Sequence, residues 1–482
     1  MQQVNSDFSF NGPDRCLNAF SIALNQADGK GWYTSTLQLQ LASLQFCVQC
    51  RSVSTLHLTI KRRIRPRVWR DVPTSDGKVK KTRITRVPVL RPLKLTWRLP
   101  VSRFGQCSSK VLANVEQLTL GDRNDEIDEV TWPSGLKTLI FGLNFNHSID
   151  GIAWPPSLQK LRFKLYFNQP IDAVTWPESL QQLTFGCKFN QAIHGVAWPP
   201  SLQQLTFGDD FNQAIHEVAW PNSLQQLTFG AWFNQPIYRI VWPASLQQLA
   251  FGDLFNQPIQ GVAWPASLQS LTFGARFNQT VDRVTWPVSL LWLTFALDFN
   301  QAVDDVSWPA ALQRLIFGDL FNQRIHGIAW PRSLQLITFG RNFNQPINGV
   351  MWPASLQHLT FGRAFNQRVD GVAWPASLQQ LTFGYDFNQP IDMGLWPASL
   401  EQITVGHTFN QAIDGVAWPA SFQRLIIFRK NFQVLTRIDL AHLSAVGCQR
   451  PQTKNSNRGS GSGHNRRVQF MRQGLGHRWT PC

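Results

Sequence analysis

Apolar and polar residues alternate in this chain in a pattern that recurs every 22 positions. The unit is clearest as Trp-Pro-x-Ser-Leu-Gln-Gln-Leu-Thr-Phe-Gly-x-x-Phe-Asn-Gln-x-Ile-x-x-Val-x, and it runs in tandem from Trp132 to Asp439. Its tryptophans follow one another without an insertion: Trp132, Trp154, Trp176, Trp198, Trp220, Trp242, Trp264, Trp286, Trp308, Trp330, Trp352, Trp374, Trp396 and Trp418. A period of roughly 20 to 30 residues is typical of a solenoid, in which each coil buries its apolar face against its neighbours. We therefore predict one array of fourteen coils.

Within each coil the pattern predicts one short strand. Leu227 and Phe229 alternate with Gln226 and Thr228, which is the period of two that a strand requires. Such strands, stacked coil upon coil, predict a mainly β fold: a leucine-rich-repeat-like solenoid with a long parallel sheet. Gly230 ends the strand, and glycine holds this place in eleven of fourteen units. A positive φ or a close approach between backbones would explain that choice.

An asparagine follows the second phenylalanine in thirteen units, from Asn146 to Asn410. A short amide that is stacked coil upon coil can bond the backbone of its own turn and of the next. We predict an inward asparagine ladder. The glycosylation sequons that begin at Asn146 and Asn278 are accordingly interpreted as chance matches.

These motifs resemble a known family. Leu-x-x-Leu-x-Phe is the strand signature of leucine-rich repeats. The sequence Phe-Asn-Gln-Pro-Ile occurs at Phe167 to Ile171, Phe233 to Ile237, Phe255 to Ile259, Phe343 to Ile347 and Phe387 to Ile391. The unit is thus similar to the FNIP repeat, a short relative in that superfamily, with Trp-Pro where the family has Leu-Pro. The resemblance implies a solenoid for protein interaction, in proteins whose other domain, an F-box or a kinase, supplies the activity; residues 1–106 show neither.

The sequence outside the regular repeats divides into regions of different character. Residues 1–35 are unassigned, 36–106 form a strand-rich region with a basic insertion at 61–92, and 107–131 are a degenerate N-terminal capping repeat before the solenoid at 132–439. Residues 440–482 are expected to hold a C-terminal cap remnant and a disordered basic tail. A short helix at 435–443 is expected to close the last coil.

Charge is concentrated outside the solenoid. The formal net charge is +16, yet residues 132–439 carry 18 Lys and Arg against 18 Asp and Glu. The basic insertion supplies candidate phosphate-binding residues: Lys61, Arg62, Arg63, Arg65, Arg67, Lys80, Lys81 and Arg83. These runs have three interpretations: binding of nucleic-acid phosphates, nuclear import, or a solvated arm.

Positions that vary from coil to coil are free to recognise a partner. The outward strand position and the two residues after the strand-ending glycine vary most, and exposed Trp and Arg are common anchors at interfaces. The candidate partner-binding residues are Trp232, Arg276, Trp292, Arg314, Arg341 and His358. The alternative interpretation is surface drift. A minor alternative is an ice-binding type of threonine ladder, which long Gln neighbours and interruptions at Ala250 and Ile316 disfavour.

Catalytic and metal chemistry find no support in the repeats. No nucleophile, base and orienting acid recur at fixed spacing, and Cys47 and Cys50 lack a second pair at zinc-site spacing. We expect no enzyme activity, no cofactor, no metal and no small-molecule substrate. Seven scattered cysteines favour a reducing compartment, and neither a secretory signal nor a membrane span is expected.

The main hypothesis is therefore a non-enzymatic scaffold or substrate-recognition module that binds an unidentified protein partner in the cytoplasm or nucleus. The alternative is a nucleic-acid-associated protein that holds phosphates through its basic flanks.

Overall fold

The computed structural model describes residues 115–391, 395–413 and 415–428, together with the backbone of short strands outside these ranges. The chain divides into two compact units, Met1–Phe255 and Asn256–Cys482, here called unit 1 and unit 2. No helix occurs in the part of the chain that the structure describes. Each unit is a parallel β-solenoid, as the 22-residue period predicts.

In unit 1, a run of parallel strands is preceded by an antiparallel pair. β3 pairs antiparallel with β4, and β4 to β11 then pair parallel, each with the next. A separate hairpin of β1 and β2 is antiparallel. The strands are β1 (Ala23–Gln26), β2 (Tyr33–Thr36), β3 (Leu56–Thr59), β4 (Leu93–Trp97), β5 (Val115–Leu120), β6 (Thr138–Ile140), β7 (Lys160–Arg162), β8 (Gln182–Thr184), β9 (Gln204–Thr206), β10 (Gln226–Thr228) and β11 (Gln248–Ala250).

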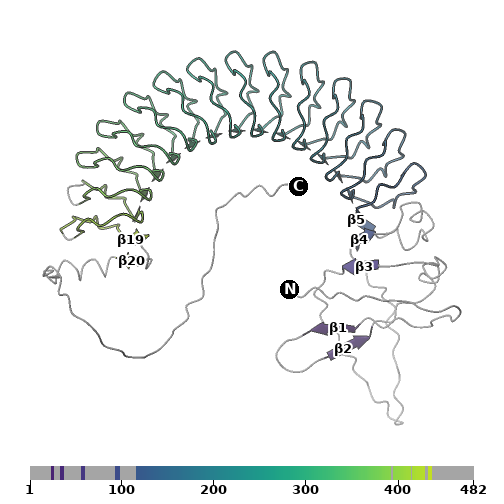
Figure 1. The fold of residues 1–482 in the computed structure, drawn as a ribbon, viewed down its shortest axis with the longest axis horizontal. Helices are drawn as coiled ribbons and strands as arrows, with labels where there is room; N and C mark the ends of the chain where they lie inside the picture. The colour runs from purple at the N-terminus through teal and green to yellow at the C-terminus, as the bar shows by residue number, and fades with distance from the viewer. Residues whose placement is uncertain are drawn as a thin grey trace, which may run out of the picture. The chain divides into compact units, whose positions relative to one another are not determined.

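In unit 2, the parallel run continues from β12 to β19 and ends on an antiparallel strand, β20. The strands are β12 (Ser270–Thr272), β13 (Trp292–Thr294), β14 (Arg314–Ile316), β15 (Leu336–Thr338), β16 (His358–Thr360), β17 (Gln380–Thr382), β18 (Gln402–Val405), β19 (Arg424–Ile427) and β20 (Gln433–Thr436). In each unit the strands line the inner side of the curve that the coils follow (Figure 1).

The helix expected at 435–443 is wrong at its first two residues, which belong to β20. Leu435 lies opposite Leu425 in the register, so the open edge of β19 offers this segment a ladder of backbone partners. Pairing with that edge satisfies backbone groups that a helix would leave exposed at β19. The remainder of the expected helix lies outside the described residues.

The core of most coils is built from two phenylalanines, with Val405 and Ile427 in place of the first one in the last two coils. In unit 2, the Phe295 and Phe299 rings stack within one coil at a centroid distance of 4.0 Å. Phe299 also stacks on Phe277 at 6.2 Å and on Phe321 at 6.1 Å in the flanking coils. All four side chains are almost fully buried, so the two phenylalanine columns run unbroken from coil to coil.

The tryptophans form a third buried column at the corner between coils. Trp330 and Trp352 stack at 6.4 Å, and the Trp352 indole also meets the Phe339 and Phe361 rings edge-on, at interplanar angles of 69° and 74°. The Trp352 Nε1 has no hydrogen-bond acceptor among the described residues. Edge-on contacts between aromatic rings are a favourable arrangement of their quadrupoles.

The predicted asparagine ladder is present and runs coil upon coil in both units. In unit 2, Asn300 Oδ1 accepts from the backbone N–H of Asn322 at 2.9 Å and from Gln323 Nε2 at 3.0 Å. The Asn300 N–H donates in turn to Asn278 Oδ1 at 2.9 Å. Each coil therefore supplies an acceptor to the next coil and takes one from the coil before.

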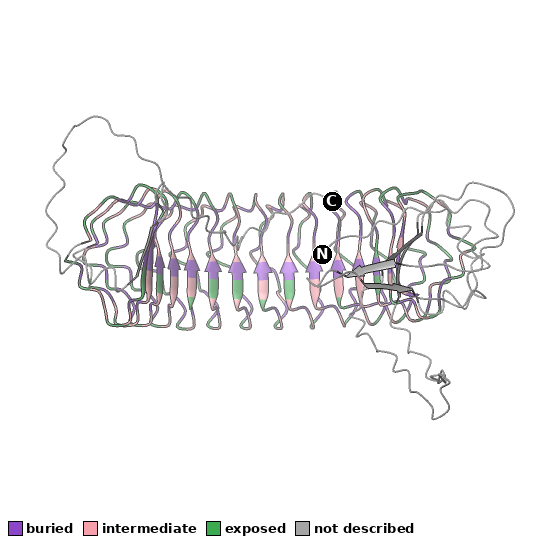
Figure 2. Cartoon of the chain, turned by 90° about the horizontal axis from the view of Figure 1, so that it is seen from below, coloured by how far each residue is buried: buried purple, intermediate pink, exposed green. Residues whose placement is uncertain are grey.

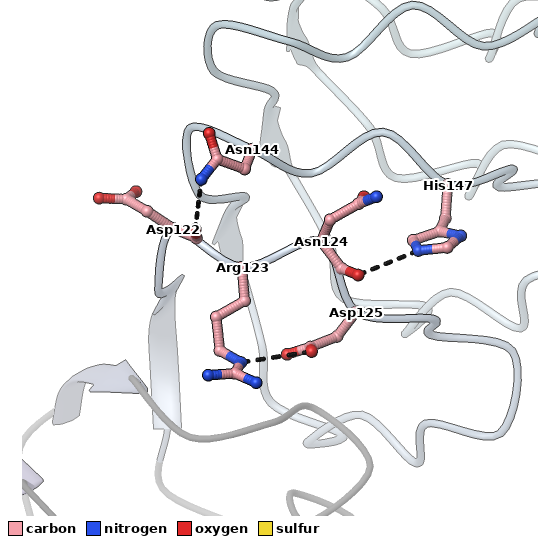
Figure 3. A network of polar contacts seen from close by, with 6 residues as sticks. All are labelled: Asp122, Arg123, Asn124, Asp125, Asn144 and His147. Atoms are coloured by element: carbon pink, nitrogen blue, oxygen red, sulfur yellow. Dashed lines mark hydrogen bonds and ion pairs between the residues drawn. The ribbon is translucent and has the colours of Figure 1, made fainter.

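In unit 1 the ladder begins in the irregular coil before Trp132. Asn124 Oδ1 accepts from the Asn146 N–H at 2.8 Å, and His147 Nε2, in place of the usual glutamine, lies 3.0 Å from the Asn124 carbonyl oxygen. Asn144 Nδ2 donates to the Asp122 carbonyl at 2.8 Å (Figure 3). This coil thus makes the ladder contacts although it lacks the Phe-Asn-Gln motif.

A second polar ladder, of serines, follows the Trp-Pro corner. The Ser355 hydroxyl donates to the Leu334 carbonyl at 2.7 Å, and the Ser377 hydroxyl donates to the Leu356 carbonyl at 2.7 Å. The same bond recurs in most coils, so the serine hydroxyl of each such coil gives a hydrogen bond to a leucine carbonyl of the preceding coil. The recurring Trp-Pro-x-Ser in the sequence carries this signal, but we did not predict a ladder from it.

The strand-ending glycine is required by a close backbone approach. A Cβ at Gly340 would lie 1.8 Å from the Gly318 carbonyl oxygen. Positive φ is found instead at a second glycine, in the return turn, where Gly349 has φ 77 and the Val350 N–H bonds the Ile347 carbonyl at 3.2 Å. That geometry is a β-turn with a left-handed third residue.

Two coils of unit 1 place a side chain at this left-handed position, Glu217 with φ 63 and Arg239 with φ 61. The left-handed conformation costs a residue with a Cβ roughly 1 to 2 kcal/mol, and glycine avoids this cost. Part of the benefit is cancelled, because glycine loses more conformational entropy than other residues when the chain folds. We expect Arg239→Gly to raise the free energy of unfolding by about 0.5 to 1 kcal/mol, measured by chemical denaturation. Arg239→Ala keeps the Cβ and is expected to leave the free energy of unfolding without such an increase. If the glycine and alanine variants were equally stable, the left-handed backbone at Arg239 would not be strained.

Candidate functional site

The candidate site is a row of outward side chains on the strand face of unit 2. Ser270, Trp292, Arg314, Leu336 and His358 are the first residues of β12 to β16 and lie opposite one another in the parallel register. Parallel strands lie about 4.8 Å apart, so these residues form one continuous line. In β12 to β16 the first residue is exposed or half-buried and the second is buried, an alternation that can be followed along the strands in Figure 2.

Trp292 and Arg314 are in contact. The Arg314 guanidinium carbon lies over the Trp292 indole, 5.1 Å from the ring centroid. The Trp292 side chain is 44% exposed, and Arg314 is exposed as well. A guanidinium within about 6 Å of an indole face is a cation–π pair. It holds both side chains in place on the surface and leaves their remaining faces free for a partner.

Aliphatic residues surround this pair where other coils have glutamine or threonine. Leu291 and Leu336 replace glutamines of the repeat, and Ile316 replaces the threonine at the end of β14. All three are half-buried. We call Leu291, Trp292, Arg314, Ile316 and Leu336 the strand-face cluster. Leu291, Ile316 and Leu336 were not among the predicted binding residues, although their changes from glutamine or threonine are visible once the strand positions are aligned.

The other predicted residues of unit 2 lie beside the cluster. His358 ends the same row, on β16. Arg276 and Arg341 lie in the loops that follow the strands; Arg276 is paired with Asp298 at 3.1 Å. In the coils between these two arginines, the exposed Leu297 takes the loop position of Arg341 and the exposed Leu320 takes that of Arg276. Sequence reasoning did not include these two leucines because exposure of a loop leucine cannot be read from the repeat pattern.

Trp232, the remaining candidate, belongs to unit 1. Its side chain is 58% exposed in the loop after β10. The neighbouring loops of unit 1 are acidic: Asp210 pairs with Lys188 at 2.9 Å, and burial together with the Asp210 and Asp253 charges raises the pKa of Asp209. This surface therefore differs in charge from the strand-face cluster.

Comparison with known proteins identifies the repeat. The family model described as FNIP Repeat matches residues 124–166, 145–188, 167–210, 189–230, 211–254, 255–298, 321–364, 343–386 and 365–408, which together make up more than half of the chain. The chain belongs to the FNIP-repeat family. No curated protein matches it.

Solved structures support the same fold for the FNIP array. The crystal structure of CroV588, described as a novel circular LRR protein, is 40% identical with a TM-score of 0.59, over 65% of this chain and 50% of that one. A chain of the Toll–Spatzle complex of Drosophila is 13% identical with a TM-score of 0.50, over 70% of this chain and 54% of that one. The FNIP array thus spans about half the length of these relatives, and the second likeness concerns the fold alone.

Three other features considered from the sequence of this FNIP protein are the basic insertion, a metal site and a membrane span. The basic insertion, which includes Lys61 and Arg83, lies outside the described residues. Within the described ranges, no three His, Cys, Asp or Glu side chains gather to hold a metal ion. The same ranges contain no helix that is long and apolar enough to cross a membrane.

Proposed function

We propose that the FNIP solenoid is a protein-interaction module and that the strand-face cluster on β13 to β15 is its recognition surface. The observation that carries the proposal is the Trp292–Arg314 pair, set among aliphatic residues in coils whose counterparts carry Gln and Thr. Most other coils keep Gln and Thr at these positions, so a local change from polar to apolar at exposed and half-buried outward positions is a departure that the fold does not need.

The composition of the cluster also suits binding to protein. Trp and Arg are the residue types most enriched among binding hot spots, and partly exposed aliphatic neighbours exclude water around them. The paired strands fix the backbone under the cluster, because β14 is hydrogen-bonded to β13 and to β15. A partner therefore meets a surface that is ordered before binding, which lowers the entropic cost of association.

We predict that Trp292→Ala weakens partner binding by at least about tenfold, the equivalent of about 1.4 kcal/mol. The measurement is quantitative affinity purification of full-length protein from source cells after nuclease treatment. Met351→Ala, which shortens an apolar side chain that is 84% exposed but lies just before the Trp352 corner, is the matched control.

A protein partner that is recovered with wild type and Met351→Ala but not with Trp292→Ala would support the proposal. If every protein that is recovered with wild type were recovered in equal amount with Trp292→Ala, the proposal would be refuted. If only nucleic acid were recovered, and only without nuclease, the function would belong to the basic segments instead.

A further inference from the structure

A strip of stacked cationic and aromatic side chains adjoins the strand-face cluster. Arg341, Arg363, Tyr385 and His407 each follow the strand-ending glycine of one coil, in four successive coils. The Arg363 guanidinium lies over the Tyr385 ring at 4.8 Å, and the Tyr385 and His407 rings stack at 5.0 Å with an angle of 8°. All four side chains are exposed. We call these residues the rim strip.

The strip and the cluster share one coil. Leu336 of the cluster is the first residue of β15, and Arg341 of the strip follows the same strand. The cluster lies on β13 to β15, and the strip, which is rich in hydrogen-bond donors, lies in the loops that follow β15 to β18, so the two surfaces meet in the coil of β15. From these placements, and on the basis of the proposed function, we infer that the partner presents an extended peptide segment with one large apolar anchor followed by spaced carboxylates.

The partner must be recognised through side chains. Each strand under the cluster is paired on both sides, β13 with β12 and β14, and β15 with β14 and β16. No strand edge is open there to accept an added strand, so the backbone hydrogen bonds of strand addition are excluded. Indole, aliphatic and guanidinium groups are what the surface offers instead.

The pattern of charge along the rim favours carboxylates over a phosphate chain. Asp386 lies 3.9 Å from Arg363, and Asp319 Oδ1 accepts from the Arg341 backbone N–H at 3.4 Å. These carboxylates lie in the coils on either side of the two arginine coils, so a nucleic acid that runs along the rim, with a charge on every nucleotide, meets repulsion on both sides of the arginines. A peptide can place single carboxylates against Arg341 and Arg363 and an uncharged residue against each aspartate, and arginine accepts a carboxylate in bidentate geometry.

The length of the segment follows from strand spacing. From β13 to β16, the strand that Arg363 follows, there are three intervals of about 4.8 Å, or roughly 14 Å, which an extended peptide spans in about four residues at 3.3 Å each. The offset along the strand from Leu336 to Arg341 adds to this length. The anchor then lies on Trp292 and Leu336, and the carboxylates lie several residues further along the peptide.

The test selects peptides on the full-length protein and then measures their affinity. Random twelve-residue peptides displayed on phage are selected against wild type, and the enriched sequences are synthesised with a fluorescent label for anisotropy titration. The variants are Trp292→Ala, the double variant Arg341→Glu/Arg363→Glu, and Arg332→Glu. Arg332 is exposed at the Trp-Pro corner, away from the rim strip, and its substitution makes half the change of charge that the double variant makes.

We expect the enriched peptides to combine an aromatic or aliphatic residue with acidic residues. Their affinity should fall by at least about tenfold in the double variant and in Trp292→Ala, and stay unchanged in Arg332→Glu. Added salt should weaken the binding, because the rim is exposed to solvent.

Two other results separate the inference from the proposed function. The selected peptides could be neutral or basic, bind the double variant as tightly as wild type, and lose their affinity in Trp292→Ala. This result would overturn the inference and leave the proposed function standing. Peptides whose affinity changes in neither variant would overturn both, since neither the cluster nor the rim strip would then contact them.

Discussion

Phe299→Ala is expected to lower the free energy of unfolding by about 3 to 5 kcal/mol, the usual cost of removing a buried phenyl ring. Phe299 is fully buried and stacks on rings from its own coil and from both flanking coils. Truncation therefore opens a cavity that interrupts the phenylalanine column. Chemical denaturation followed by near-ultraviolet circular dichroism measures the change.

Two variants control for this prediction. Phe299→Leu keeps most of the side-chain volume and is expected to cost much less than the alanine variant. Trp292→Ala removes a larger ring from an exposed position and is expected to change stability by less than about 1 kcal/mol. If Trp292→Ala proved as destabilising as Phe299→Ala, Trp292 would be a structural residue and its binding phenotype would need a different explanation.

Asn300→Ala is expected to cost about 1 to 3 kcal/mol, because it leaves the partly buried backbone N–H of Asn322 without its acceptor, Asn300 Oδ1. The side-chain amide of Gln323 also loses its bond to Asn300 Oδ1 but keeps the one to the Asn300 backbone carbonyl. Hydrogen exchange gives a local readout, since the Asn322 amide should exchange faster than the amides of distant rungs.

Asn300→Asp is the matched control for this ladder variant. It retains an oxygen acceptor at the same place and should protect the Asn322 amide better than alanine does. Equal exchange rates in the alanine variant and wild type would show that the ladder bond contributes nothing to stability.

The fold could be predicted from the sequence because each coil repeats the same information. A single strand of three residues is too short to recognise with confidence, but alternation like that of Leu227 and Phe229 with Gln226 and Thr228 is repeated through the array at a fixed spacing. The asparagine ladder could be predicted for the same reason. A single asparagine such as Asn300 does not indicate a ladder, whereas an asparagine at the same position of successive coils indicates stacked amides.

The end of the array was harder to predict, because there the repetition stops. The apolar residues between Leu435 and Leu443 fit helical spacing as well as strand spacing. What decides for β20 is the unpaired edge of β19, a tertiary feature that no local pattern contains.

The candidate site was predicted in part. Trp292, Arg314 and His358 were identified as outward positions of neighbouring strands, and the register does place them in one row. The ring contact between Trp292 and Arg314 could not be predicted, because it depends on side-chain conformation. Trp232 was placed in the same predicted set as the strand-face residues, but it lies in unit 1, where the loops are acidic.

The asparagine ladder also bears on how such a chain changes length over generations. Each rung has the same partners, one coil before it and one coil after it, at the same distance of 2.9 Å for Asn278, Asn300 and Asn322. A recombination event that adds or removes one whole coil therefore rejoins compatible surfaces and leaves every hydrogen bond of the array matched. Loss of a coil that carries part of the strand-face cluster or of the rim strip would shorten the protein by one ordinary unit and also remove part of that surface, so a change in copy number that the fold tolerates can still alter the surface.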